Sequence, residues 1–292
     1  MKKILSVLTS IALISTLFVG CSNNSTKSSS SSDVSGTITY DGSSALAPLV
    51  DSAATMFKAL HPNVSIPSAG TKGSGTGISA VISGAVDIGG SDVLATKFTD
   101  DVTANKLVDH PICIVGISAV IDKSLGITNL TSAQLKKVFT DSTITKWNQL
   151  DSSFPNKPIT VIVRAKGSGT RVVFDSAALG DASVRTDSAL VTGSSNGDVE
   201  TKVNATPGAI GYLALSYTVS SAGTNILPLN LNGVTPTYAN IYSGTYKIIG
   251  IEHAYTKGTP NAQTDAFIKY MSSSAFASKI ESSGYGLMSK MK

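Results

Sequence analysis

The 292-residue chain has few of the residues from which metal centres and redox sites are built. Its cysteines are Cys21 and Cys113, which are too far apart to form a Cys-x-x-Cys redox pair. Its three histidines are scattered, and none has the cysteine or acidic neighbours at the spacing typical of a metal site. The sequence therefore predicts neither a bound metal ion nor a cofactor.

Charged residues are also sparse, at 14% of the chain, and aromatic residues make up 6%. No block of Lys and Arg, RNA-binding motif or aromatic platform is present, so the sequence argues against nucleic acid as a partner. The formal charge of +4 includes Lys2 and Lys3. If these leave with an N-terminal signal, 21 basic and 19 acidic residues remain, and the balance is close to neutral.

The N-terminus has the order of an export signal. Lys2 and Lys3 precede an apolar run over residues 4–19, and Gly20 provides the small residue before a cleavage site. The run is too short and wrongly flanked for a stable membrane span. We therefore expect residues 1–20 to be a signal peptide.

Cys21 directly follows this segment, and the arrangement resembles the lipobox of bacterial lipoproteins. The resemblance implies a lipid on Cys21, with diacylglycerol on the thiol and an acyl chain such as palmitate on the new N-terminus. Phe18 departs from the motif, which usually has Leu there, and ordinary secretion with an incidental Cys21 is the alternative. Residues 21–35, rich in Ser, predict a flexible tether. We expect a lipid-anchored protein on the extracytoplasmic face of the cell membrane.

From residue 36 onward, short β-branched runs alternate with segments whose apolar residues recur at helical spacing. This alternation predicts an α/β protein with mainly parallel sheets. Two extended segments, near Cys113 and near Ile249, are candidate crossovers between two lobes. The predicted boundaries place residues 36–113 and 250–292 in lobe I and residues 114–249 in lobe II.

Three loops rich in Gly and Ser, at residues 41–45, 73–92 and 164–171, each join a strand pattern to a helix pattern. Such junctions direct backbone N–H groups and hydroxyls into a small volume, as an oxyanion requires. Arg164 adds a guanidinium and Asp92 adds a carboxylate. Each feature alone is more typical of a plain connector, a helix cap or a surface residue. Their occurrence together favours one anion held between two lobes.

Residues 42–48, residues 73–77 with 86–92, and residues 164–170 resemble, in order and separation, the phosphate-binding lipoproteins of high-affinity phosphate ABC transporters, the PstS family. The resemblance extends to residues 208–212. It implies the two-lobed type II periplasmic-binding-protein fold with two hinge crossovers. It further implies a monomeric receptor without catalytic residues, which binds inorganic phosphate and delivers it to membrane permease subunits.

The resemblance also implies the residues that bind phosphate, which are Ser44, Ala45, Ser74, Asp92, Arg164, Ser168, Gly169 and Thr170. Lys166 stands where relatives often carry an acidic residue, and Ala45 where they often carry an aromatic one. Whether Arg171 also faces the ligand stays open. Asp92 can accept a hydrogen bond from the P–OH of phosphate, whereas sulfate has no proton to offer and would be repelled.

Three alternative functions remain open from the sequence. The first is a receptor for another oxyanion, such as molybdate, tungstate or sulfate, against which Asp92 argues. The second is a phosphate sensor that signals through a membrane partner. The third is a secreted phosphatase with Ser168 or Thr170 as nucleophile, which lacks an evident general base or metal cluster.

Overall fold

The computed structural model describes residues 34–220 and 224–291. The predicted signal peptide, Cys21 and most of the predicted tether lie outside these residues. Within the described ranges, no helix has both the length and the apolar character that crossing a membrane requires.

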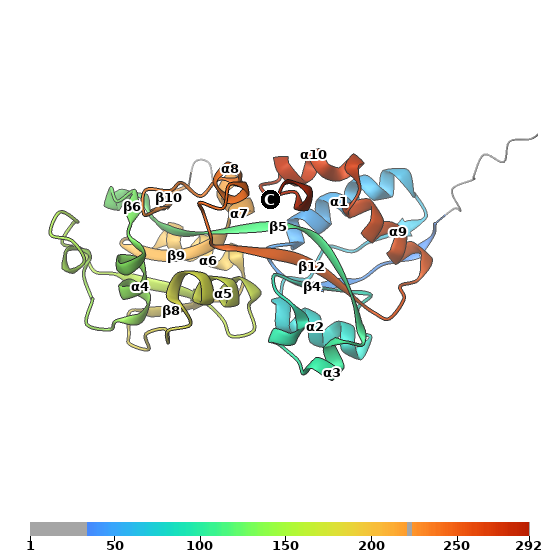
Figure 1. The fold of residues 1–292 in the computed structure, drawn as a ribbon, viewed down its shortest axis with the longest axis horizontal. Coiled ribbons are helices and arrows are strands. Elements are labelled where there is room, and N and C mark those ends of the chain that lie inside the picture. Colours follow the sequence, from blue (N-terminus) through green and yellow to red (C-terminus); the bar gives the residue numbers. More distant parts are fainter. Residues whose placement is uncertain (1–33, 221–223, 292) are drawn as a thin grey trace, which may run out of the picture. The chain divides into compact units, whose positions relative to one another are not determined.

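A sheet of eight strands runs through the described chain in the order β2-β4-β12-β5-β9-β7-β8, with β10 paired to β5 (Figure 1). Its strands are β2 (Tyr40–Gly42), β4 (Ile88–Ser91), β5 (Leu107–Asp122), β7 (Thr160–Arg164), β8 (Leu190–Gly193), β9 (Ala209–Ala214), β10 (Ile226–Pro228) and β12 (Ile249–Lys257). Two short parallel pairs lie apart from it, β1 (Gly36–Thr37) with β3 (Val64–Ser65) and β6 (Asn129–Leu130) with β11 (Asn230–Leu231).

Strands β5 and β12 connect the two halves of the sheet. They pair with each other antiparallel from Ile249 opposite Gly116 to Lys257 opposite Leu107, and each is antiparallel to its other neighbours as well. Parallel pairing holds for β2 with β4 and for β7 with β8 and β9. The prediction of mainly parallel sheets is therefore wrong for the two long strands, because one carries the chain across and the other returns it. Residues 34–292 group into one compact unit, so the lobe boundaries stay a prediction.

Helices cover both faces of each half of the sheet (Figure 1). Lobe I here names the half of the sheet that holds β2 and β4, and lobe II the half that holds β7, β8 and β9. The helices on the lobe I half are α1 (Ala47–Leu60), α2 (Ser74–Ser83), α3 (Asp101–Ala104), α9 (Ala262–Met271) and α10 (Ser274–Ser282). Those on the lobe II half are α4 (Ser132–Thr140), α5 (Gly169–Phe174) with a following π-helical turn (Asp175–Leu179), α6 (Asn196–Ala205), α7 (Leu215–Ser220) and α8 (Tyr238–Tyr242).

Each half has its own aromatic core. In lobe I, Phe57 of α1 packs edge to face on Phe267 of α9, with ring centroids 5.3 Å apart. In lobe II, the ring of Phe174 stacks on Tyr212 of β9 at 4.1 Å. Cys113 is a free thiol, fully buried in the lobe I core. Burial of this apolar surface holds the strand ends in place, and the polar loops at those ends are fixed by it.

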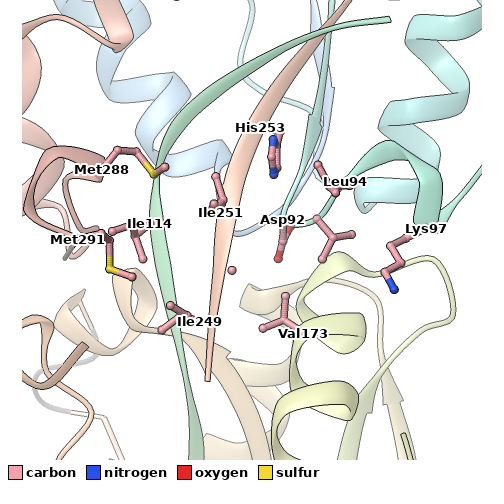
Figure 2. A pocket seen from close by; sticks show the side chains of 12 residues that line it. Asp92, Leu94, Lys97, Ile114, Val173, Ile249, Ile251, His253, Met288 and Met291 are labelled. Carbon is pink, nitrogen blue, oxygen red and sulfur yellow. The ribbon is translucent and has the colours of Figure 1, made fainter. Parts of the chain in front are cut away.

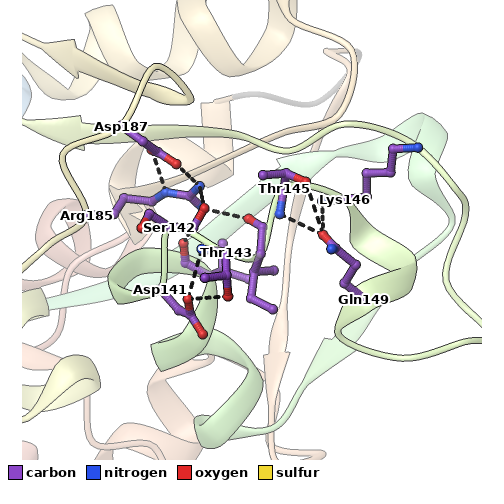
Figure 3. A network of polar contacts seen from close by, with 10 residues as sticks. Asp141, Ser142, Thr143, Thr145, Lys146, Gln149, Arg185 and Asp187 are labelled. Carbon is purple, nitrogen blue, oxygen red and sulfur yellow. Dashed lines mark hydrogen bonds and ion pairs between the residues drawn. The ribbon is translucent and has the colours of Figure 1, made fainter.

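A buried arginine ties together the loops of lobe II that lie away from the sheet (Figure 3). The Arg185 guanidinium donates to the backbone carbonyls of Val138, Ser142 and Ile144. It also forms an ion pair with Asp187. These bonds satisfy one carbonyl in the last turn of α4 and two in the loop that follows it, so they make this part of lobe II rigid.

Helix α2 lies unusually close to strands β2 and β4. A Cβ atom at Gly77 would lie 2.6 Å from Gly42 Cα, 2.7 Å from the Asp41 carbonyl oxygen and 2.8 Å from the Gly90 carbonyl oxygen. All three neighbours are backbone atoms, which cannot rotate away. Glycine at position 77 is therefore required for α2 to place Ser74, its first residue, beside the end of β4.

We expect Gly77→Ala to lower the free energy of unfolding by about 1–3 kcal/mol, because the added methyl group pushes α2 away from the sheet. Urea unfolding followed by circular dichroism measures the change. Gly197→Ala is the matched control, since a Cβ there would make only an ordinary contact of 3.8 Å with Tyr217 and alanine favours the helix. Equal stability of the Gly77→Ala variant and the wild type would contradict the close approach.

Candidate functional site

The loop between β2 and α1 places Ser44 and Ala45 at the end of a buried strand. Ser43 Oγ accepts hydrogen bonds from the N–H groups of Ala45 and Leu46, both at 3.0 Å. The hydroxyls of Tyr40 and Tyr285 donate to the carbonyls of Ser43 and Ala45. The buried Tyr40 and Tyr285 side chains thus hold this loop in place. The Ala45 N–H, predicted to face a ligand, is bonded within its own loop.

Ser74 and Asp92 meet on the lobe I side. Ser74 Oγ donates to Asp92 Oδ1 at 2.9 Å, and the Asp92 N–H donates to Ser74 Oγ at 3.2 Å. Both residues are at most 1% exposed. Because Ser74 begins α2 and Asp92 follows β4, the close packing of that helix on that strand sets their separation.

The lobe II loop comes within hydrogen-bond distance of this pair. Thr170 Oγ1 donates to Asp92 Oδ2 at 2.6 Å, and the Gly75 N–H donates to the Gly167 carbonyl oxygen at 2.9 Å. A Cβ at Gly169 would lie 2.4 Å from Ser74 Oγ, so only glycine allows the two loops to approach this closely. The structure therefore brings together the predicted residues of the second and third loops.

Arg164 ends β7 and is 1% exposed. Its Nη1 donates to Thr170 Oγ1 at 3.3 Å and its Nη2 to the Ser194 carbonyl at 3.2 Å, while its buried Nε has no partner. Burial lowers the pKa of this guanidinium, and the Asp92 carboxylate opposes that shift. Among the described residues, no carboxylate forms an ion pair with Arg164, so much of its hydrogen-bonding capacity is available to an anion.

Three further residues of the third loop lie beside this cluster. Ser168 is buried and caps α5, accepting a hydrogen bond from the Arg171 N–H at 3.2 Å. Arg171 forms an ion pair with Asp175 at 3.1 Å and donates to the Arg164 carbonyl, which commits its guanidinium away from Asp92. Lys166 is exposed. The position where relatives often carry an acid therefore lies at the surface of the loop.

Asn196, the first residue of α6, was not among the predicted site residues. Its Nδ2 donates to Ser44 Oγ at 3.0 Å and to Thr170 Oγ1 at 3.3 Å, which joins Ser44 to the cluster. The residue follows β8 through the sequence Gly193-Ser194-Ser195. This is a fourth Gly and Ser-rich junction of strand and helix, so the pattern that identified the other three loops could have identified it too.

A pocket of about 570 Å³ lies next to the two crossing strands (Figure 2). Asp92 and His253 contribute to its lining, but most of the wall is apolar, including Ile249, Met288 and Met291. A small oxyanion needs converging N–H and O–H donors, which this wall does not supply. The polar cluster at the loop ends is therefore the better candidate for an anion site.

A family model described as "PBP superfamily domain" matches residues 27–275. The phosphate-binding protein PstS of Bacillus subtilis is 37% identical over 252 residues, which cover 86% of this chain and 80% of that protein. The chain belongs to the PstS family of the PBP superfamily. Among solved structures, a putative phosphate ABC transporter substrate-binding protein with bound phosphate from Clostridium perfringens has the same fold, with a TM-score of 0.75 at 24% identity over 87% of this chain and all of that one. An ABC-type phosphate transport receptor from Vibrio cholerae gives 0.64 at 25% identity, over 86% of this chain and 99% of that one.

Glu252 lies on β12 as a fully buried carboxyl group. Both of its side-chain oxygens lack a hydrogen-bond partner. Burial, reinforced by the charge of Asp92, raises the pKa of Glu252 well above its usual value of 4.5, and the neighbouring Ser43 hydroxyl opposes the shift. Because an unpaired buried charge is costly, burial favours the protonated form of Glu252.

The raised pKa of Glu252 makes the free energy of unfolding depend on pH. The folded state holds the Glu252 proton more tightly than the unfolded state, so stability falls as the pH rises above about 4.5, by up to about 1.4 kcal/mol per pH unit for one proton. We expect Glu252→Gln to remove this contribution. Urea unfolding of both proteins from pH 4 to pH 8 measures the two slopes, with the exposed Glu281→Gln as control. Parallel curves for wild type and Glu252→Gln would show that Glu252 carries a charge when buried.

Proposed function

We propose that the protein is an extracytoplasmic receptor that captures inorganic phosphate between its two lobes and delivers it to the permease of an ABC transporter. The observation that carries the proposal is the contact of Asp92 with donors from both lobes, Ser74 on one side and Thr170 on the other. Support comes from the relatives, since the Bacillus subtilis protein is named for phosphate binding and the Vibrio cholerae protein for phosphate transport.

The proposed ligands are Ser44, Ala45, Ser74, Asp92, Arg164, Ser168, Gly169 and Thr170. Hydroxyls and the Arg164 guanidinium supply donors to the anionic oxygens of phosphate, and charge-assisted bonds of this kind are the strongest in proteins. Asp92 supplies an acceptor. Phosphate at neutral pH retains a P–OH that donates to it, whereas sulfate would set its lone pairs against the carboxylate. This difference favours phosphate over sulfate, molybdate and tungstate.

We extend the proposal to the anchor. Cys21 would carry the lipid and residues 21–35 would tether the receptor, as a monomer, to the outer face of the membrane within reach of the permease subunits. Support for this part comes from the order of residues 1–21 alone. Mass spectrometry of the mature N-terminus tests it, with diacylglycerol on Cys21 as the expected result and an unmodified thiol as the contrary one.

Titration calorimetry on phosphate-stripped protein tests the function. We expect tight binding of phosphate, weak or absent binding of sulfate and molybdate, and loss of most of the phosphate affinity in Arg164→Ala, which lacks the guanidinium. Comparable affinity for all three anions would favour the general oxyanion receptor. Hydrolysis of a chromogenic phosphate ester that is lost in Ser168→Ala or in Thr170→Ala would instead indicate a phosphatase.

The variant Asp92→Asn tests the mechanism of selection. An amide keeps the shape of the side chain but removes the charge that repels a fully deprotonated anion. We expect the ratio of phosphate affinity to sulfate affinity to fall by about tenfold or more, mainly because sulfate binds better. The same titrations on Asp92→Asn measure the ratio. An unchanged ratio would assign the selection to another part of the site.

A further inference from the structure

Asn196 is fully buried between the two lobes, although nothing in the proposed phosphate site assigns it a role. It belongs to lobe II, at the start of α6, and Ser195 before it caps the helix by accepting from the Asp198 N–H. Its side chain bonds to Ser44 of lobe I and Thr170 of lobe II, which are both proposed phosphate ligands.

The orientation of the Asn196 amide is fixed by its backbone neighbour. Its Oδ1 accepts a hydrogen bond from the Ala214 N–H, at the end of β9, at 3.0 Å. A backbone N–H can only donate, so the amide oxygen must face Ala214 and the NH₂ group must face the site. Asn196 therefore presents donors, and not its acceptor, to the two hydroxyls.

These donors determine what the hydroxyls can do. Ser44 Oγ accepts from both the backbone N–H of Asn196, at 3.1 Å, and its Nδ2, at 3.0 Å. A hydroxyl has two acceptor positions and one proton, so both acceptor positions of Ser44 are used and its proton is left to donate. Thr170 Oγ1 likewise accepts from Asn196 Nδ2 and Arg164 Nη1, and it donates to Asp92.

We propose that Asn196 is a positioning residue that turns the hydroxyls of Ser44 and Thr170 into obligatory donors and links Ser44 to lobe II when the lobes are together. The inference rests on the proposed phosphate site. Asn196 acts through the two hydroxyls and needs no contact with the anion. It adds to specificity, because a ligand that offered a donor at either hydroxyl would find no free acceptor there.

A double-mutant cycle with inorganic phosphate tests the coupling. We expect Asn196→Ala to weaken phosphate binding by about tenfold or more in the wild-type background, and by clearly less in a Ser44→Ala background, where the hydroxyl is already gone. Ser168→Ala provides the control background, since the hydrogen bonds of Asn196 go to Ser44, Thr170 and Ala214 and not to Ser168, so the losses should multiply there. Equal losses from Asn196→Ala in all three backgrounds would overturn the proposal.

The isosteric Asn196→Asp covers the case in which the alanine variant fails to fold. A carboxylate offers only acceptors, so the hydroxyls would turn toward it at neutral pH and phosphate binding would weaken. Protonation restores one donor, and we expect the affinity relative to wild type to recover as the pH falls toward 4.5. Asp92 and Arg164, the charged groups that face the same hydroxyls, are common to both proteins, so dividing by the wild-type affinity at each pH removes their contribution and that of phosphate itself. A ratio that does not change with pH would indicate a purely structural role.

The controls separate this inference from the function on which it rests. Wild-type protein that fails to bind phosphate would refute the proposed function. If the wild type binds phosphate and folded Asn196→Ala binds it equally tightly, only the role of Asn196 is refuted. Melting temperatures by circular dichroism establish that each variant is folded before its affinity is compared.

Discussion

The hydrogen bond from Thr170 to Asp92 joins the two lobes at a buried carboxylate that faces a set of donors. A desolvated carboxylate is costly unless hydrogen bonds satisfy it, and Asp92 receives them from Ser74 in lobe I and Thr170 in lobe II. Its neighbours are therefore constrained to be donors. The close approach of α2 to the sheet, the glycine at 169 and the buried phenols beneath residues 43–45 all serve to bring those donors together.

The same hydrogen bonds can be replaced by bonds to an anion. Each group of the cluster is bonded to another member, so the lobes can lie together without burying unsatisfied hydroxyls. An anion that entered would replace these bonds with charge-assisted ones and would supply a partner for the buried Arg164 Nε. The free energy of binding is then a difference between two hydrogen-bond networks, of which the one without the anion leaves Arg164 Nε unpaired. Selectivity depends on which groups of the site donate and which accept a hydrogen bond, more than on the number of bonds.

Much of this could be predicted from the sequence because the relevant patterns are local. The helical spacing over residues 46–60 and the β-branched run before Arg164 give α1 and β7 nearly as observed. The segments of β5 and β12 were predicted as the two crossovers, but their antiparallel pairing with each other was not, since strand pairing depends on long-range contacts that short runs do not encode. Asn196 was missed for a related reason, because a polar residue in a helix start gains its meaning only from Ser44, which lies 152 residues away.

Glu252 shows how the crossing strands also shape the electrostatics of the site. A second ionised carboxylate near Asp92 would repel an anion, yet Glu252 lies on β12 close enough to be influenced by the charge of Asp92. Burial favours the protonated form of Glu252, which disfavours a second negative charge beside Asp92. The sequence pattern could not predict this, because Glu252 stands in an ordinary strand pattern. The groups near enough to interact with it electrostatically, Tyr40, Tyr285 and Cys113, come from three other segments. The fold thus influences the charge balance of the cluster through a residue that forms no hydrogen bond with the hydroxyl donors.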